Sequence, residues 1–240
     1  MSIDRALRMY FVQGRRPNRA QNILISRSKH LYLLKDEKLK YQKSVLDPRT
    51  SGSKRLLYTL LALDQDTGVY YAELHPQETY NDLAGFLTRA WSSKYLHPMQ
   101  GVPDEVNLPR IAYEDKNINA DIQKAIELCR FCPGHLPGGF AAGIRLLAVY
   151  EQRILESRWT VDPEPRDISL DLAQGLSGIC SAQSANYTAE AWQRLKQTLR
   201  PIPAEWISYV NALYDSPDGW RSGMWEYVLN GPRSSTRVPQ

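Results

Sequence analysis

The most regular pattern of hydrophobic residues in this chain predicts a pair of adjacent β-strands. The run LLYTLLALD at 56–64 is apolar at almost every position, which is typical of a strand buried on both faces. The polar turn DQDTG at 64–68 and a second apolar run, VYYAELHP at 69–76, complete a predicted β-hairpin. Weaker patterns predict a strand at 41–47 (YQKSVLD) and another at 109–115, which includes RIAYED.

Helical spacing of apolar residues dominates the rest of the chain. Between 79 and 96 the apolar residues recur at helical intervals, and Thr79 is the expected N-cap. The composition of CPGHLPGG at 132–139 predicts a loop. The other predicted helices are 3–13, 118–130, about 140–156, 169–183, 188–199, 203–215 and 218–229.

Composition excludes several classes of protein. With 42% hydrophobic residues in 240, the chain can bury a sizeable core, which excludes collagen-like and wholly disordered proteins. No apolar run approaches the ~20 residues of a membrane span, and MSIDRALRMYFVQGRR lacks the apolar region of a secretory signal. Three cysteines, an odd number, favour reduced thiols. We therefore expect a cytoplasmic protein that has no membrane partner.

Charge is concentrated at one end of the sequence. Residues 1–55 contain fourteen Lys and Arg against four acids, a net charge of +10, whereas the remaining 185 residues carry −6. Such a basic segment favours a polyanionic partner, and DNA is the expected one. Its two basic clusters are Arg15, Arg16 and Arg19, and Lys38, Lys40 and Lys43. The alternative is a solvated basic face that has no partner.

The order of these elements resembles the catalytic core of DDE integrases and transposases. Residues 56–91, LLYTLLALDQDTGVYYAELHPQETYNDLAGFLTRAW, resemble that family's second and third strands and first helix. GVPDEVNLPRIAYEDKN at 101–117 resembles its Gly-x-Pro segment and the strand that ends in the second catalytic Asp. CPGHLPGGFAAGIRLLAVYEQRIL resembles the loop and helix that carry the catalytic Glu. The resemblance covers about residues 41–157.

The resemblance implies a mixed α/β, ribonuclease-H-like core. On this interpretation residues 1–40 form a basic helical arm, 41–160 the core, 161–230 a helical C-terminal region and 231–240 a disordered tail. The helical C-terminal region departs from the small β-barrel that follows the core in many family members. Five of the six Trp lie from residue 159 onward, and core packing is the expected role, with base stacking by Trp220 and Trp225 as the alternative.

The resemblance also implies a metal site of three carboxylates that hold Mg²⁺ or Mn²⁺ for phosphodiester chemistry. Asp115, at the end of RIAYED, matches the second position. Asp47 is the acid nearest the first position, although Ser44 matches the family pattern better. Thirty-five residues separate Asp115 from Glu151, although the Gly-x-x-Glu pattern counted from Gly143 falls on Leu146. The candidate catalytic and metal-binding set is therefore Asp47, Asp115 and Glu151, and it departs from the family pattern at two positions.

Cys129, Cys132 and His135 form the one other ligand-like spacing. Structural zinc is not expected, because only one cysteine pair is present and zinc takes four ligands.

Three functional interpretations remain open from the sequence. The first is a DNA-binding, integrase- or transposase-like protein of a mobile genetic element, with an incomplete metal site. The second is an active Mg²⁺-dependent DNA recombinase that uses Asp47, Asp115 and Glu151. The third is a non-enzymatic protein-interaction subunit of unrelated α+β fold. Partner proteins or homo-oligomers are compatible with each, and whether the chain is an enzyme is left open.

Overall fold

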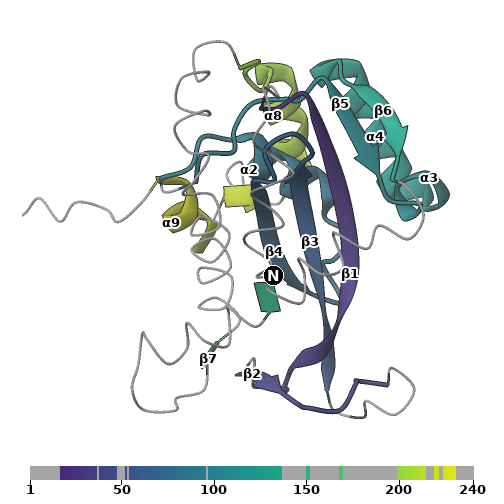
Figure 1. Ribbon diagram of the computed structural model, residues 1–240, viewed down its shortest axis with the longest axis vertical. Helices are drawn as coiled ribbons and strands as arrows, with labels where there is room; N and C mark the ends of the chain where they lie inside the picture. The colour runs from purple at the N-terminus through teal and green to yellow at the C-terminus, as the bar shows by residue number, and fades with distance from the viewer. Residues whose placement is uncertain are drawn as a thin grey trace, which may run out of the picture.

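A computed structural model of the chain describes its core and parts of its C-terminal region. The described residues are 17–36, 38–47, 52, 54–95, 97–136, 150–151, 168–169, 199–214, 219–221 and 224–230. Seven strands form one mixed sheet with helices packed on it (Figure 1).

The centre of the sheet is β1 (Ala20–Leu33), the longest described strand. On one side it pairs antiparallel with β3 (Arg55–Asp64), which pairs antiparallel with β4 (Tyr70–Pro76). On the other side its first residues pair parallel with β5 (Glu105–Leu108), which pairs parallel with β6 (Cys132–His135). The order β4–β3–β1–β5–β6, three antiparallel strands followed by two parallel ones, is that of a ribonuclease-H-like core. The predicted fold class is confirmed.

Two short strands extend the sheet at the far end of β1. β2 (Lys38–Tyr41) pairs antiparallel with Leu31–Leu33 of β1, and β7 (Ile168–Ser169) pairs with β2. β1 also contains a bulge, where its register with β3 shifts between Arg27 and Tyr32. The Ser28 hydroxyl accepts the backbone N–H groups of His30 and Leu31 and so holds the bulge.

Helices cover one face of the sheet. α2 (Leu83–Trp91), α4 (Lys116–Cys129) and α8 (Ala204–Ala212) contact one another and bury the larger core, which includes Trp91 and Trp206. The 3₁₀ turn η1 (Gly219–Arg221) and α9 (Met224–Asn230) continue this layer. On the opposite face a second core gathers leucines of β1 and β3 with Tyr70 and Tyr150.

The β3–β4 hairpin confirms the prediction made from its apolar pattern, to within one residue at each start. The turn between the strands is held by Asp64, whose carboxylate accepts N–H groups from Asn18 and Thr67. Burial raises the pKa of this carboxyl to about 6.

Several other predictions are wrong. The strand expected at 41–47 ends at Tyr41, and the strand expected at 109–115 ends before Pro109, because proline has no N–H for the ladder. Residues 111–114 instead form the short helix α3 (Ile111–Glu114). The 132–139 loop begins with a strand, since residues 132–135 form β6. The N-cap of α2 is Asp82 rather than Thr79, since the Asp82 carboxylate accepts the Gly85 N–H.

The core sheet also begins earlier than predicted. β1 lies within residues 1–40, the segment interpreted as a helical arm, so the central strand comes from Ala20 onward. The predicted helices at 118–130 and 203–215 correspond to α4 and α8, and the one at 218–229 divides into η1 and α9. The predicted helix at 3–13 and most of those at 140–156, 169–183 and 188–199 lie outside the described residues, as does the tail at 231–240, and Ser169 belongs to β7.

Candidate functional site

Asp115 lies at the start of helix α4 and caps it. Its carboxylate Oδ1 accepts the backbone N–H groups of Asn117 and Ile118 at 2.9 and 3.0 Å. An aspartate in this position satisfies backbone donors that the helix itself leaves unpaired. The structure thus gives Asp115 a local structural partner and does not place it at the end of a strand.

Asp47 and Glu151 both lie close to the bulged part of β1. Asp47 is exposed and follows Leu46, whose N–H donates to the Lys29 carbonyl at 2.8 Å. Burial raises the pKa of Glu151, and the opposing influences are a hydrogen bond from Ser28 and the positive charges of His30 and Lys29. The bulge therefore has carboxylates near it from two distant parts of the chain.

The predicted three-carboxylate site is not assembled by these residues. Among the residues that the structure describes, which include Asp47, Asp115 and Glu151, no group of three or more His, Cys, Asp or Glu side chains is placed to hold a metal ion. Mg²⁺ and Mn²⁺ take several oxygen ligands at once. The residues present therefore do not fit the metal centre that the family resemblance implies.

Cys129, Cys132 and His135 do not form a metal-binding group in the described part of the chain either. Cys129 is buried at the end of α4, and burial raises the pKa of its thiol to about 12. Cys132 is exposed at the start of β6, and the His135 ring packs against Tyr113 at 4.3 Å between centroids.

The described members of the two predicted basic clusters lie at opposite ends of β1. Arg15 and Arg16 are outside the described residues, but Arg19 precedes β1 and pairs with Asp66 through Nε at 2.8 Å and Nη2 at 3.2 Å. Lys38 and Lys40 lie on β2, which pairs with the other end of β1. Fourteen residues of extended strand span roughly 45 Å, so the structure does not bring Arg19 to the lysines.

Lysines and aromatic rings gather where β1, β2 and the start of β3 meet. Lys40 lies directly opposite Tyr32, so both side chains share one face of the sheet, and the Lys54 ammonium lies 4.8 Å from the centre of the Tyr32 ring. Tyr41 and Lys43 are exposed at the end of β2. We call this group the basic hairpin end; it consists of Lys29, Lys38, Lys40, Lys43 and Lys54 with Tyr32 and Tyr41.

The basic hairpin end lies away from the helical layer. In Figure 1 β2 lies near the bottom of the view, whereas α2, α4 and α8 lie in the upper half. From residue 29 to 54 the sequence holds seven Lys and Arg against three acids. One of these acids, Asp36, pairs with Lys38 at 3.3 Å. The surface is therefore basic, and its lysine side chains lie close to tyrosine rings.

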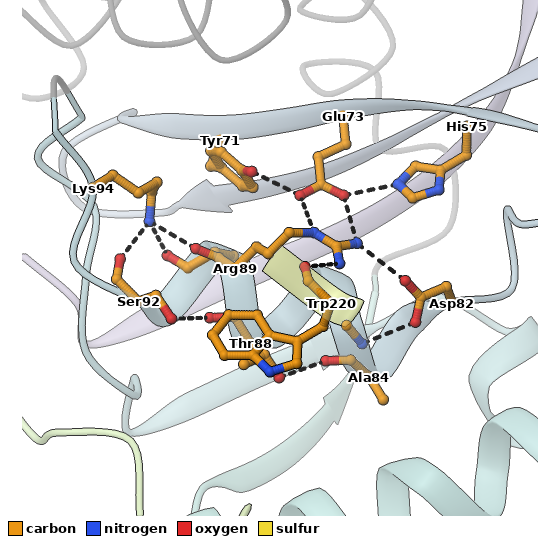
Figure 2. A network of polar contacts seen from close by, with 12 residues as sticks. Tyr71, Glu73, His75, Asp82, Ala84, Thr88, Arg89, Ser92, Lys94 and Trp220 are labelled. Carbon is orange, nitrogen blue, oxygen red and sulfur yellow. Dashed lines mark hydrogen bonds and ion pairs between the residues drawn. The ribbon is translucent and has the colours of Figure 1, made fainter. Parts of the chain in front are cut away.

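A second charged group is buried between β4 and α2, and the sequence analysis missed it. Figure 2 shows Glu73 of β4 facing Arg89 of α2, with Asp82, His75 and Tyr71 around them. Arg89 donates from Nε and Nη2 to the two Glu73 oxygens at 2.8 and 3.0 Å, and from Nη2 to Asp82 at 3.1 Å. Glu73 also accepts from the Tyr71 hydroxyl at 2.7 Å and contacts His75 Nε2 at 2.8 Å. We call these five residues the buried ion cluster.

The C-terminal region closes over the buried ion cluster. Arg89 Nη1 donates to the Trp220 carbonyl at 2.7 Å, and the Trp225 ring lies 4.8 Å from the guanidinium carbon. The same Trp225 ring stacks on His75. Trp220 and Trp225 are 4% and 9% exposed, so core packing is confirmed for both and base stacking is not available to them.

Charge pairing sets the ionisation of the buried ion cluster. Burial alone would raise the pKa of Glu73, but the charge of Arg89 and hydrogen bonds from His75 and Arg89 lower it to about 2. Burial opposes the charge of Arg89, yet Glu73 and Asp82 raise its pKa well above the ordinary value. Because both groups stay charged and have no contact with solvent, this cluster holds elements together and offers no reacting atom.

Comparison with known proteins gives few leads. No protein-family model matches the chain, and no curated protein matches it. Among solved structures, a chain in the cryo-electron microscopy structure of a simian T-cell lymphotropic virus intasome with the PP2A regulatory subunit B56 gamma is similar, with a TM-score of 0.42 and 15% identity. The match covers 70% of this chain and half of that one. A TM-score of this size does not establish a shared fold, so the fold assignment rests on the strand order.

No described helix is both long enough and apolar enough to cross a membrane.

Proposed function

We propose that this chain is a DNA-binding protein of the integrase and transposase type, belonging to a mobile genetic element. On this proposal the basic hairpin end holds DNA phosphates, and no metal site is formed by Asp47, Asp115 and Glu151. One observation carries the proposal: five lysines and two tyrosines gather at the end of a ribonuclease-H-like sheet that the helical layer does not cover.

The charge of this surface suits a phosphate backbone. Each Lys that approaches a phosphate releases condensed counterions, and this release supplies most of the affinity of sequence-independent DNA binding. Lys29 and Lys43 are exposed, and the bulge held by Ser28 sets the course of the strand that carries Lys29. A β-bulge often re-aims side chains beside a functional surface, which supports a binding role here.

The strand-transfer alternative has less support. It needs three converging carboxylates, and in the described part of the chain Asp115 caps α4 while Glu151 contacts Ser28 of β1. Partner proteins and homo-oligomers stay predictions, and they are compatible with a protein that binds DNA without cutting it.

The test of DNA binding compares two exposed lysines. Lys43→Glu reverses a charge at the basic hairpin end, and Lys116→Glu makes the same change at the first turn of α4, where a negative charge is favourable. Affinity for a labelled DNA duplex is measured by fluorescence anisotropy across a range of salt concentrations. Lys43→Glu should lower the affinity about tenfold and reduce the salt slope by about one. Lys116→Glu should leave both within about twofold of wild type.

Two results would overturn the proposal. Equal losses in both variants, or no salt-dependent binding by the wild-type protein, would favour the protein-interaction subunit of the third interpretation. Mg²⁺- or Mn²⁺-dependent nicking or joining of DNA that disappears in Asp115→Asn would favour the active recombinase.

A further inference from the structure

We propose that the basic hairpin end prefers single-stranded DNA to duplex DNA, because Tyr41 stacks on an unpaired base. This inference rests on the proposed function and names the form of DNA that the surface takes. It depends on how Tyr41 is held, on the charges beside it and on the contrast with another exposed tyrosine.

Tyr41 is anchored at its backbone but keeps much of its ring in solvent. It ends β2 and lies directly opposite Leu31 of β1, a residue that is completely buried. Its ring lies 5.9 Å from the His30 ring at an interplanar angle of 39°, and 48% of the residue is exposed. The ring is thus supported on one side and available to a ligand, with little ordering needed on binding.

Tyr41 lies beyond the described pairing of β2 with β7. Among the residues that the structure describes, β7 pairs with Lys38 and Leu39 of β2 and not with Tyr41. The chain then turns back to β1, since the Gln42 N–H donates to the His30 carbonyl at 3.0 Å. Tyr41 therefore lies at a corner of the sheet that a nucleic-acid strand can reach.

Exposed positive charge lies near this ring. Lys43 follows Tyr41 by two residues on the exposed surface, whereas the adjacent Lys40 shares the other face of the sheet with Tyr32. Lys29, which is also exposed, precedes the His30 that supports the ring. Alternating cations and an aromatic face are the features by which proteins hold single strands, with phosphates on the cations and a base on the ring.

The preference for a single strand follows from where bases expose their faces. In a duplex each base is stacked between its neighbours and presents only an edge in a groove, so an aromatic side chain gains nothing from stacking. An unpaired base presents a whole face, and stacking on an aromatic ring does not depend strongly on which base it is. Tyr41 should therefore contribute to single-strand binding alone, whereas Lys43 contributes to both forms.

Tyr95 is a matched control because it has the exposure without the charge. It is 55% exposed, and its backbone N–H donates to the Val228 carbonyl, far from β2 in the fold. The adjacent Lys94 is buried, with its ammonium donating to the carbonyls of Arg89, Ala90 and Ser92. It cannot serve as a phosphate ligand for Tyr95.

The experiment measures affinity for three labelled probes of about 12 nucleotides, within the site sizes usual for such surfaces. They are oligo-dT, an abasic strand that has the same phosphates, and a duplex. Tyr41→Ala and Tyr41→Leu should each lower the affinity for oligo-dT about tenfold and leave the abasic strand and the duplex within about twofold. Tyr41→Phe should retain wild-type affinity, and Tyr95→Ala should change none of the three.

The inference is overturned if Tyr41→Ala leaves oligo-dT binding unchanged or weakens all three probes equally. It is also overturned if Tyr41→Leu retains wild-type affinity, because a leucine has bulk without an aromatic face. Failure of the proposed function is distinguishable, since wild-type protein would then bind none of the probes in a salt-dependent way. Thermal unfolding of each variant shows whether it is folded, and Tyr41→Phe keeps the test valid if the smaller residues destabilise β2.

Discussion

Every nitrogen of the Arg89 guanidinium has a partner and the side chain is 1% exposed, whereas Lys43 at the basic hairpin end is exposed to solvent. The buried ion cluster joins β4 and α2, which follow each other in sequence, to the C-terminal region, 131 residues from Arg89. The basic hairpin end involves only the neighbouring strands β1, β2 and β3 among the described elements. The buried charge of Arg89 is therefore committed to the fold, whereas the charge of Lys43 is exposed to a ligand.

Breaking the buried pair should have the largest effect on stability. Arg89→Met leaves Glu73 buried without its main counter-charge, and removal of one partner from such a pair costs about 3–5 kcal/mol. The free energy of unfolding, measured by urea denaturation, should fall by that amount. The double variant Glu73→Met/Arg89→Met should recover part of it, since no uncompensated pair member is then left.

The exposed pair Arg55–Glu78 is the control for this comparison. Its partners lie 3.1 Å apart and are 30% and 57% exposed, so Arg55→Met should cost less than about 1 kcal/mol. Equal losses in Arg89→Met and Arg55→Met would show that burial does not distinguish the two kinds of charge.

Acid should weaken the buried ion cluster over a defined range of pH. The pKa of Glu73 is about 2 in the folded protein against an ordinary value of 4.5, so its contribution to stability is complete above pH 4.5. That contribution is lost as the pH falls toward 2, because the unfolded chain takes up the proton first. Urea denaturation at several pH values should show a steeper loss for wild type than for Glu73→Met/Arg89→Met, by about one proton. Parallel pH profiles would exclude Glu73 as the group responsible.

Asp115 should show a smaller effect that separates a structural role from a catalytic one. Asp115→Ala removes the cap of α4 and should lower the free energy of unfolding by about 1 kcal/mol. Asp115→Asn should stay near wild type, because asparagine caps helices as well as aspartate. A large loss of stability in Asp115→Asn would mean that the carboxylate charge has a partner other than the helix N–H groups.

The sequence predicted the β3–β4 hairpin well because its signal is local. Two apolar runs separated by a short polar turn leave few other arrangements. β1 was missed because AQNILISRSKHLYL mixes amides and hydroxyls with leucines, and because the bulge at Ser28 interrupts the two-residue alternation. The Asp115 cap carried a local signal, an Asp just before a helical pattern, that was interpreted as chemistry instead.

The candidate sites were predictable in part. The lysines at 38–43 were identified from charge alone, and the structure adds the aromatic rings of Tyr32 and Tyr41 beside them. The buried ion cluster could not be found in this way, since Glu73 and Arg89 meet only when α2 packs on β4, and Trp220 lies 131 residues from Arg89. Long-range contacts of this kind leave no periodic trace in a single sequence.

Because β1 lies at the centre of the sheet, its partner strands become available at different times during synthesis. Its parallel partner β5 lies far along the chain, and Asn22 and Asn107, whose side chains are hydrogen-bonded at 3.0 Å, are 85 residues apart. At roughly 5–20 residues per second, a ribosome needs about 4–17 s to make that stretch. During this interval one edge of β1 can pair with β3 and its far end with β2, while Ala20–Asn22 on the other edge still lack β5. Nascent copies made close together are therefore exposed to each other at Ala20–Asn22, residues that the finished protein buries.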